Sequence, residues 1–306
     1  MQSESLIDSS MDFDVIIPAH NRIDLLRRAI QSVLEQELPA QRLVVVDDAS
    51  TKDLSSVRSW AERHGCVWER LEVNQGPAAA RNLGVSLGVS QWVTFLDSDD
   101  IWHPRKLIDQ AEWHADNPEF RISQVRESWV RGGRELRKPR HWEPSGGDLF
   151  ADSCERCSIG PSCVAMSRGL WEEAGGFDSR YRVCEDYQLW LRVTKSEMVG
   201  LVPGRPRVEK HAGHGDQLSS LVLAMDRYRV IALLELLIGG HLTKGQRALV
   251  IKKVRQKARI LMQGAAKRGM DHRSDIYRCV LALKLEEADS AIDSVVATLW
   301  REVSSG

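Results

Sequence analysis

The chain has 306 residues, with 42 Lys and Arg against 43 Asp and Glu, for a formal net charge of −1. This length accommodates one large domain or two ordinary ones. The balanced charge argues neither for a nucleic-acid footprint nor for an acidic tail, so we expect no nucleic-acid partner. No window carries the roughly 18 uncharged apolar residues that a membrane-spanning helix needs. Residues 1–11 lack the basic start and apolar stretch of a secretory signal, so we expect a flexible leader there and a cytoplasmic protein.

The first hundred residues alternate between strand-like and helix-like hydrophobic patterns. Short apolar runs predict strands, and apolar residues three and four positions apart predict helices between them. This alternation is typical of a doubly wound α/β domain with a parallel sheet. Strands are predicted at residues 13–17, 42–48, 67–73 and 91–97, and helices at 22–36, 53–65 and 77–88.

Polar residues follow the predicted strands where the strands end. In such sheets, ligands bind beyond the carboxyl ends of the strands. The stretches are PAHN (18–21), DDAS (47–50) and DSDD (97–100), joined by NQGPAAARN (74–82). None has the glycine pattern of a dinucleotide site or of a P-loop.

Three aspartates close together end the fourth strand. Asp97 and Asp99, in D-x-D spacing, are hard oxygen ligands suited to Mg²⁺ or Mn²⁺. The alternative is that these acids cap the helix that follows, a role that we assign to Asp100.

Two of the six cysteines, Cys154 and Cys157, have the C-x-x-C spacing of many zinc sites. The sequence offers no second C-x-x-C and no H-x-x-x-H pair. We therefore favour idle or buried thiols in a reducing cytoplasm over a structural zinc.

Five motifs in fixed order resemble the inverting family 2 glycosyltransferases of GT-A fold. They are VIIPAHNR, VVVDDAS, NQGPAAARNLG, FLDSDDIWHP and CEDYQLWLR. The resemblance covers about residues 12–216, and implies a nucleotide-binding half at 12–103 and an acceptor half at 104–216. It further implies an α/β fold with a mixed, mainly parallel central sheet, and transfer of a sugar from a nucleoside diphosphate with help from Mn²⁺ or Mg²⁺.

The same resemblance implies roles for individual residues. In the D-x-D motif, Asp99 would be the more certain metal ligand of the two aspartates. Asp97 would contact the ribose or the water shell of the metal. The nucleotide base would lie against Pro18, Ala19 and Asn21, with Asp48 hydrogen-bonded to it and Arg81 near the base or phosphates. We interpret Asp47 and Asn82 as braces of their loops at least as readily as ligand contacts.

Direct displacement of the diphosphate requires a base that takes the proton of the acceptor hydroxyl. The family pattern assigns this role to Asp186, with Glu185 as a supporting group; the alternative is that both acids only complement a helix dipole. Gly175 and Gly176 are expected to form a tight bend, and Trp190 is interpreted as core.

A third metal ligand is expected beyond the base. His214, between two glycines, is the first candidate, and His211 is the second. In the region between the sheet and the base, Glu127, Trp129 and Trp142 are candidates for a sugar pocket, although core or edge packing explains them equally.

From residue 217 to 306 the pattern is helical, which predicts a C-terminal helical appendage. One helix carries a basic run: Lys252, Lys253, Arg255, Lys257, Arg259, Lys267 and Arg268. Charge on a solvated face is the common explanation; peripheral contact with the inner membrane face and a homodimer are the alternatives.

The leading hypothesis is a metal-dependent, inverting hexosyltransferase acting from a nucleotide-sugar donor to a glycan or lipid-linked acceptor. UDP-sugars are favoured because uridine is the commonest donor base in the family. The alternative is a non-catalytic relative that binds sugar nucleotides or glycans. An unrelated nucleotide-binding α/β enzyme is disfavoured by the missing glycine patterns.

Overall fold

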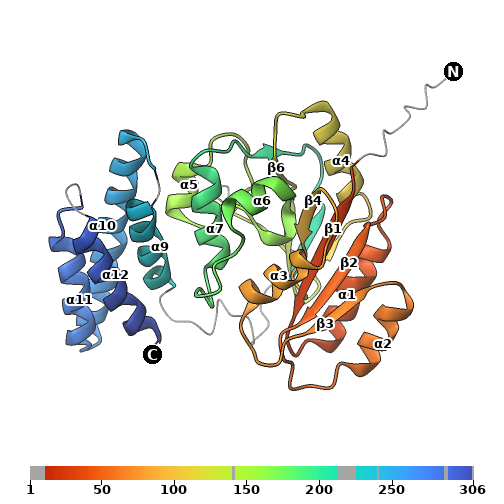
Figure 1. The fold of residues 1–306 in the computed structure, drawn as a ribbon, viewed down its shortest axis with the longest axis horizontal. Coiled ribbons are helices and arrows are strands. Elements are labelled where there is room, and N and C mark those ends of the chain that lie inside the picture. The colour runs from red at the N-terminus through yellow and green to blue at the C-terminus, as the bar shows by residue number, and fades with distance from the viewer. Residues whose placement is uncertain (1–10, 140–141, 212–224, 240, 286–288, 305–306) are drawn as a thin grey trace. The chain divides into compact units, whose positions relative to one another are not determined.

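The computed structural model describes residues 11–139, 142–211, 225–239, 241–285 and 289–304 (Figure 1). The chain divides into two compact units, which we call unit 1 and unit 2. Among the described residues, unit 1 contains 11–149, 159–182 and 197–211, and unit 2 contains 150–158, 183–196 and everything from 225 onward.

Unit 1 is built on a seven-stranded sheet of order β10-β6-β9-β4-β1-β2-β3. Strand β9 runs antiparallel to both β4 and β6, and the other neighbours are parallel. The expected mixed, mainly parallel sheet is confirmed. The strands are β1 (Phe13–Ala19), β2 (Arg42–Asp47), β3 (Val67–Arg70), β4 (Trp92–Phe95), β6 (Ile122–Gln124), β9 (Val164–Ser167) and β10 (Gly200–Leu201).

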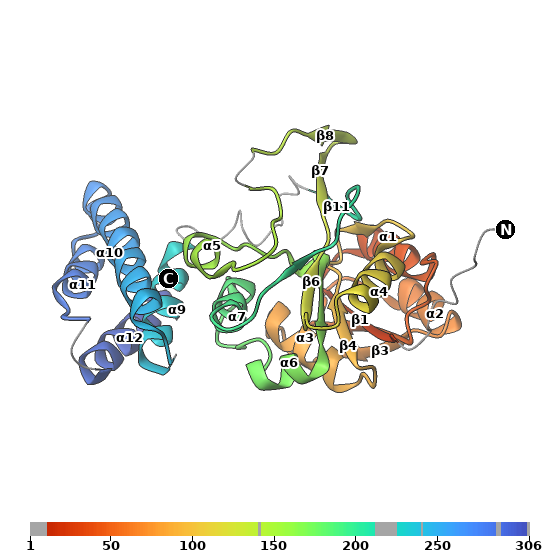
Figure 2. The same cartoon turned by 90° about the horizontal axis from the view of Figure 1, so that it is seen from above.

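Helices cover both faces of this sheet, as Figure 2 shows for unit 1. On one face, apolar residues of β1 and β2 share a buried core with α1 (Ile23–Leu34), α2 (Ser55–Arg63) and α4 (Lys106–Asp116). On the other face lie α3 (Pro77–Ser86) and α6 (Arg168–Ala174).

Gly84 explains how closely α3 packs on the sheet. A Cβ atom at this position would meet the Ile16 side chain of β1 at 2.4 Å. Because glycine has no side chain, the helix backbone can approach the strand directly. This close packing fixes α3, and with it Arg81, at the carboxyl edge of the sheet.

A second, four-stranded sheet of order β5-β11-β7-β8 was not anticipated from the sequence. Strands β7 (Glu127–Arg131) and β11 (Val208–His211) pair in parallel, although about 80 residues separate them along the chain. β5 (Ile101–Trp102) and β8 (Arg134–Leu136) are the antiparallel edges. This pairing sets Glu209 opposite Ser128 and brings Lys210 close to Glu127.

Unit 2 is helical. It contains α5 (Phe150–Glu155), α7 (Glu185–Thr194), α9 (Asp226–Gly239), α10 (Lys244–Lys267), α11 (Asp271–Ala282) and α12 (Asp289–Ser304). Thr243 and Gln246 form a capping box at the start of α10. The expected C-terminal helical appendage is confirmed, and α5 and α7 belong to the same compact unit. Across the described residues, no helix combines the length and the apolar character that crossing a membrane requires.

A lysine is fully buried at the start of α4. Lys106 has no exposed surface. Its Nζ donates to Thr94 Oγ1 and, at 3.3 Å, to the Val164 carbonyl oxygen. The same Nζ lies 3.8 Å from the centre of the Trp102 ring. Burial lowers the pKa of Lys106 well below its ordinary value of 10.5. Folding therefore disfavours the charged form of Lys106, because the ammonium group would lose its hydration.

We expect Lys106→Met to stabilise the protein by about 1 kcal/mol at neutral pH, because a polar group leaves the core with little change in volume. Because folding lowers the pKa of Lys106, the unfolded chain binds more protons than the folded chain between the lowered value and 10.5, so the free energy of unfolding should rise with pH across that window. Urea unfolding between pH 6 and 10 should show this slope reduced in Lys106→Met and retained in Lys52→Met, where the lysine is exposed. An undiminished slope in Lys106→Met would contradict the assignment.

Candidate active site

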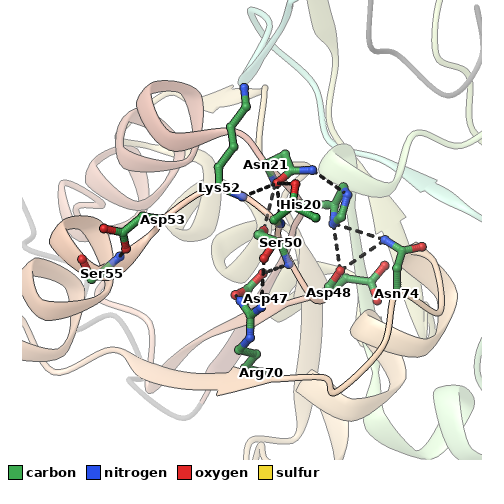
Figure 3. A network of polar contacts seen from close by, with 11 residues as sticks. His20, Asn21, Asp47, Asp48, Ser50, Lys52, Asp53, Ser55, Arg70 and Asn74 are labelled. Atoms are coloured by element: carbon green, nitrogen blue, oxygen red, sulfur yellow. Dashed lines mark hydrogen bonds and ion pairs between the residues drawn. The ribbon is translucent and has the colours of Figure 1, made fainter.

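Asn21 ties together the loops that follow β1 and β2. Its backbone is left-handed, with φ 59°, a conformation that Asn tolerates. Its N–H donates to Ser50 Oγ at 2.9 Å, and its side-chain oxygen accepts from the N–H groups of Thr51 and Lys52 at 2.8 and 2.9 Å (Figure 3). Asn21, predicted to contact a base, here holds one strand-end loop on the other.

Asp48 joins the end of β2 to the loop before α3. Its Oδ1 accepts from the Gln75 N–H at 2.7 Å and its Oδ2 from the Gly76 N–H at 2.8 Å, and the residue is buried. Each carboxylate oxygen has a second acceptor position, so Asp48 retains capacity for a donor on a ligand. Pro18, half-buried, and Ala19, buried, end β1 beside the last residues of β2.

His20, which was not among the residues singled out from the sequence, lies between Asn21 and Asp48. Its Nδ1 is 2.8 Å from the carbonyl oxygen of Asp48, and its Nε2 is 2.8 Å from the side-chain nitrogen of Asn21. Asn74 contributes a further hydrogen bond to the same carbonyl at 3.2 Å (Figure 3). The signal was present: His20 stands between two residues already singled out in PAHN.

Asp47 and Asn82 both make hydrogen bonds that brace loops, which is one of the two roles left open from the sequence. Asp47 accepts from the Ser50 N–H at 2.8 Å and forms an ion pair with Arg70. The side chain of Asn82 exchanges two hydrogen bonds with the backbone of Phe177, at 2.7 and 3.0 Å. In this structure, the polar atoms of both side chains are engaged by other groups of the protein.

The acids after β4 are paired with arginines. Arg81 donates to Asp97 Oδ1 at 2.6 Å, and Arg22, just beyond β1, forms an ion pair with Asp99. Burial alone would raise the pKa of Asp97, but the charges of Arg81 and Lys210 outweigh burial and lower it. The strand ends thus hold carboxylates and guanidinium groups side by side.

Asp100 does not cap a helix, so that interpretation is wrong. Helix α4 begins at Lys106 after Arg105, with no side-chain cap. Asp100 is buried, and it accepts hydrogen bonds from Ser162 Oγ at 2.6 Å and from the His211 N–H at 3.3 Å. Burial raises the pKa of Asp100 well above its ordinary value.

Asp97 and Asp99 supply the oxygen atoms that Mg²⁺ and Mn²⁺ prefer, so this donor pair fits such an ion. An ion bound at Asp99 would compete with Arg22 for the carboxylate. Among the described residues, no group of three or more His, Cys, Asp or Glu side chains is placed to hold a metal. His214, the first candidate for a third ligand, lies outside the described residues, and His211 Nε2 is 2.7 Å from Glu209 Oε1.

Lys210 and Glu127 form a charged pair on the second sheet. Lys210 Nζ is 3.8 Å from Glu127 Oε2, which also accepts from Cys163 Sγ at 3.2 Å. Burial opposes the charge of Lys210, but the carboxylates of Glu127, Asp100 and Asp97 raise its pKa well above the ordinary value. Lys210 is thus a cation of the aspartate cluster that no sequence motif indicated.

Two of the predicted pocket residues, Glu127 and Trp129, lie on β7, and the third, Trp142, follows β8 in the chain. Trp129 Nε1 donates to Glu127 Oε1 at 2.6 Å, and the rings of Trp129 and Trp142 lie 5.9 Å apart. Glu127 is buried, whereas Trp142 is exposed. Of the two tryptophans, Trp142 is the more exposed. A sugar-binding role for these residues stays a prediction.

In unit 2, α7 begins with Glu185 and Asp186. The residue before them, Cys184, has a left-handed backbone with φ 62°, which turns the chain sharply into the helix. Glu185 is buried and Asp186 is half-buried. Trp190 is fully buried, which confirms its interpretation as core.

The predicted tight bend is confirmed in unit 1, where Gly175 and Gly176 follow α6 with φ 73° and 65°. Both values lie in the left-handed region, which glycine adopts without strain. A Cβ at Gly176 would also approach the Trp171 ring at 2.9 Å. The bend leads the chain past Asn82.

Residues 14–172, just over half of the chain, match the sequence model of the family described as glycosyl transferase family 2. The chain belongs to glycosyl transferase family 2. Curated relatives of this family 2 protein include the succinoglycan biosynthesis protein ExoU of Rhizobium meliloti, 34% identical over 59% of the chain and 56% of the relative. The amylovoran biosynthesis glycosyltransferase AmsB of Erwinia amylovora is 30% identical over 66% of the chain and 70% of the relative.

A glycosyltransferase of Rickettsia felis is 30% identical over 61% of the chain, and the match spans about a third (31%) of that relative's length. Among solved structures, TarS of S. aureus in complex with UDP superposes with a TM-score of 0.65 at 16% identity, covering 89% of this chain and 90% of TarS. The mannosyltransferase PcManGT of Pyrobaculum calidifontis, solved with GDP-Man and Mn²⁺, gives 0.56 at 19% identity over 95% and 86%. These likenesses confirm the GT-A fold.

Proposed function

We propose that this family 2 protein is an inverting glycosyltransferase that moves a sugar from a nucleoside diphosphate donor to an acceptor hydroxyl. The observation that carries the proposal is the gathering of Asp48, Asp97, Asp99 and Arg81 at the carboxyl ends of β1, β2 and β4, beside the loop that follows β1. These residues stand at the positions where the family pattern has its donor site. Solved relatives of the same fold hold UDP, UDP-GlcNAc and GDP-Man.

In the proposed reaction, Asp186 accepts the proton of the acceptor hydroxyl as its oxygen attacks the anomeric carbon. The bond from that carbon to the diphosphate breaks, and the diphosphate leaves with the bonding electrons. Arg81 is the cation that we place near the leaving phosphates. A divalent ion held by Asp99 and His214, with Asp97 reaching the ribose or the water shell of the ion, would supply positive charge to the same diphosphate.

Asp48 and the neighbouring Pro18, Ala19, His20 and Asn21 are proposed to receive the nucleotide base. A second acceptor position on the Asp48 carboxylate suits the ring N–H of uracil. Thymine and guanine also carry a ring N–H, so UDP-sugars are our first choice of donor because uridine is the commonest donor base in the family. The names of ExoU, AmsB and the teichuronic acid relative TuaG of Bacillus subtilis point to a growing glycan as the acceptor.

The deciding experiment is calorimetric titration with UDP, GDP and dTDP, each with and without Mn²⁺, followed by a transfer assay with the matching nucleotide sugars. Binding of one nucleotide together with turnover of its sugar supports the proposal. Binding without turnover of any donor favours the alternative, a non-catalytic relative. If none of the three binds at millimolar concentration, both accounts fail.

We also propose peripheral contact with an anionic membrane through α10, at the cytoplasmic face. Lys244, Lys252, Arg255 and Arg259 line a groove of about 720 Å³ on this helix. Lys253 and Lys257, from the same basic run, instead pair with Glu155 and Asp226. A homodimer stays a prediction from the sequence.

We expect vesicles containing phosphatidylglycerol, but not neutral vesicles, to sediment with the protein. Each cation near an anionic surface contributes roughly 1 kcal/mol, so Lys252→Glu with Arg259→Glu should weaken binding at least about tenfold. Lys267→Glu with Arg268→Glu makes the same charge change at exposed positions outside the groove. Equal loss in both variants would argue against the groove as the contact.

A further inference from the structure

The proposed base is held by a cysteine. Cys157 Sγ lies 3.1 Å from Asp186 Oδ2, within unit 2, so the thiol donates a hydrogen bond to the carboxylate. The other oxygen, Oδ1, accepts from the Tyr187 N–H at 2.6 Å. Two donors from different chain segments therefore engage the two oxygens, which restrains rotation of the carboxylate.

The chain around Cys157 is itself anchored. Ser153 and Ser158, on either side of it, are joined through their hydroxyls at 2.7 Å. On α5, the carbonyl of Cys154 accepts from the Tyr187 hydroxyl at 3.0 Å. The segment 153–158 is thus fastened to the first turn of α7, where Asp186 lies.

Helix α10 holds the same segment from another direction. Lys257 Nζ donates to the Glu155 carbonyl at 2.9 Å and pairs with Asp226 at 3.2 Å, and Lys253 forms an ion pair with the Glu155 side chain. Lys257 is buried, so its contacts are screened little by solvent. These anchors give Cys157 a defined position.

The C-x-x-C spacing now has an explanation that needs no metal. Cys154 reaches Tyr187 through its carbonyl, and Cys157 reaches Asp186 through its thiol, so the two cysteines contact adjacent residues of α7. Cys154 is fully buried, whereas Cys157 is half-buried and its Sγ is directed at the carboxylate. The thiol of Cys157 is therefore not idle.

We propose that Cys157 is a positioning residue for Asp186: its thiol holds the carboxylate in the orientation that accepts the proton of the acceptor hydroxyl. This rests on the proposed function, in which Asp186 is the base. A base acts only when it lies within hydrogen-bonding reach of the proton in the reactive geometry, and small misplacements cost large factors in rate.

The first test is kinetic and uses the full chain. Cys157→Ala should lower kcat about tenfold or more, with the KM for the donor changed less than about twofold, because the donor site is untouched. Cys157→Ser should restore most of kcat, since a hydroxyl also donates a hydrogen bond. Cys279→Ala, at an exposed cysteine of α11, should behave as wild type. Thermal unfolding of each variant reports whether it is folded.

The second test needs no activity. The Asp186 carboxylate accepts a hydrogen bond from the S–H group of Cys157 and repels the thiolate, which is the form that iodoacetamide alkylates. Asp186→Ala should therefore speed alkylation of Cys157 severalfold. The rate at Cys279, measured in the same sample, should stay unchanged. Mass spectrometry of the peptides measures both rates. An unchanged rate at Cys157 means that the contact is absent, and the proposal fails.

The two levels of inference fail separately. If Asp186→Asn keeps full activity, the proposed function is wrong in its choice of base. If Asp186→Asn is inactive while Cys157→Ala keeps wild-type kcat, or if folded Cys157→Ser is as slow as Cys157→Ala, only the positioning role is overturned.

Discussion

Asp186→Asn is expected to lower kcat by about 10²–10⁴-fold with little change in nucleotide affinity. The amide keeps the size of the carboxylate and can still accept from the Tyr187 N–H, but it cannot take a proton from the acceptor hydroxyl. A general base typically accelerates a reaction by a factor in this range. Initial rates of transfer, with nucleotide binding measured on the same samples, check both parts.

The matched control is Asp271→Asn, because Asp271 also lies in the first turn of a helix, α11, and is exposed. It removes the same charge from the same kind of position, so any contribution of the helix dipole alone should appear in both variants. Similar activities in Asp186→Asn and Asp271→Asn would favour the dipole explanation over a base. Glu185→Gln should have a smaller effect than Asp186→Asn if Glu185 is only a supporting group.

Asp99→Asn is expected to abolish the strengthening of nucleoside diphosphate binding by Mn²⁺, a loss of at least about tenfold in affinity at saturating metal. An amide is a weaker ligand than a carboxylate for a hard divalent cation, and it brings no negative charge to the site. Binding without metal should change little or improve, because Arg22 loses its carboxylate partner and can face the diphosphate. Titrations of UDP with and without Mn²⁺ measure the difference.

Asp116→Asn, at the exposed end of α4, serves as the control for charge alone. Undiminished dependence on Mn²⁺ in Asp99→Asn would remove Asp99 from the metal site. The ion pair with Arg22 would then be the role that the structure leaves to Asp99 in the wild type.

Sequence patterns predicted the strands of the sheet well because a run of apolar residues depends on burial within one short segment of the chain. The buried runs at 13–17, 42–48 and 91–97 became β1, β2 and β4, and the polar residues after them meet at one edge because those strands are parallel. Gly175 and Gly176 form the expected bend because left-handed backbone is a local demand. Each of these features depends on neighbours in the sequence.

The counter-charges were missed because their partners are distant along the chain. Arg22 meets Asp99, and Lys210 joins the aspartate cluster only after β11 pairs with β7. Asp100 resembled a cap, yet its partner Ser162 lies 62 residues away. A periodic pattern carries no information about which isolated cation or hydroxyl tertiary folding will bring to a carboxylate.

Unit 2 is assembled from segments that lie far apart in the chain, and this affects the order in which the protein folds during synthesis on the ribosome. Helix α7, which carries Asp186, packs with α9, and α5 packs with α10, although both partners are translated after residue 225. Domains generally fold as units while the chain emerges, so a nascent chain can complete β1, β2 and β4 long before α7 has its neighbours. The proposed donor-binding residues are therefore ordered early, and the proposed base acquires its packing later, once α9 and α10 have been made.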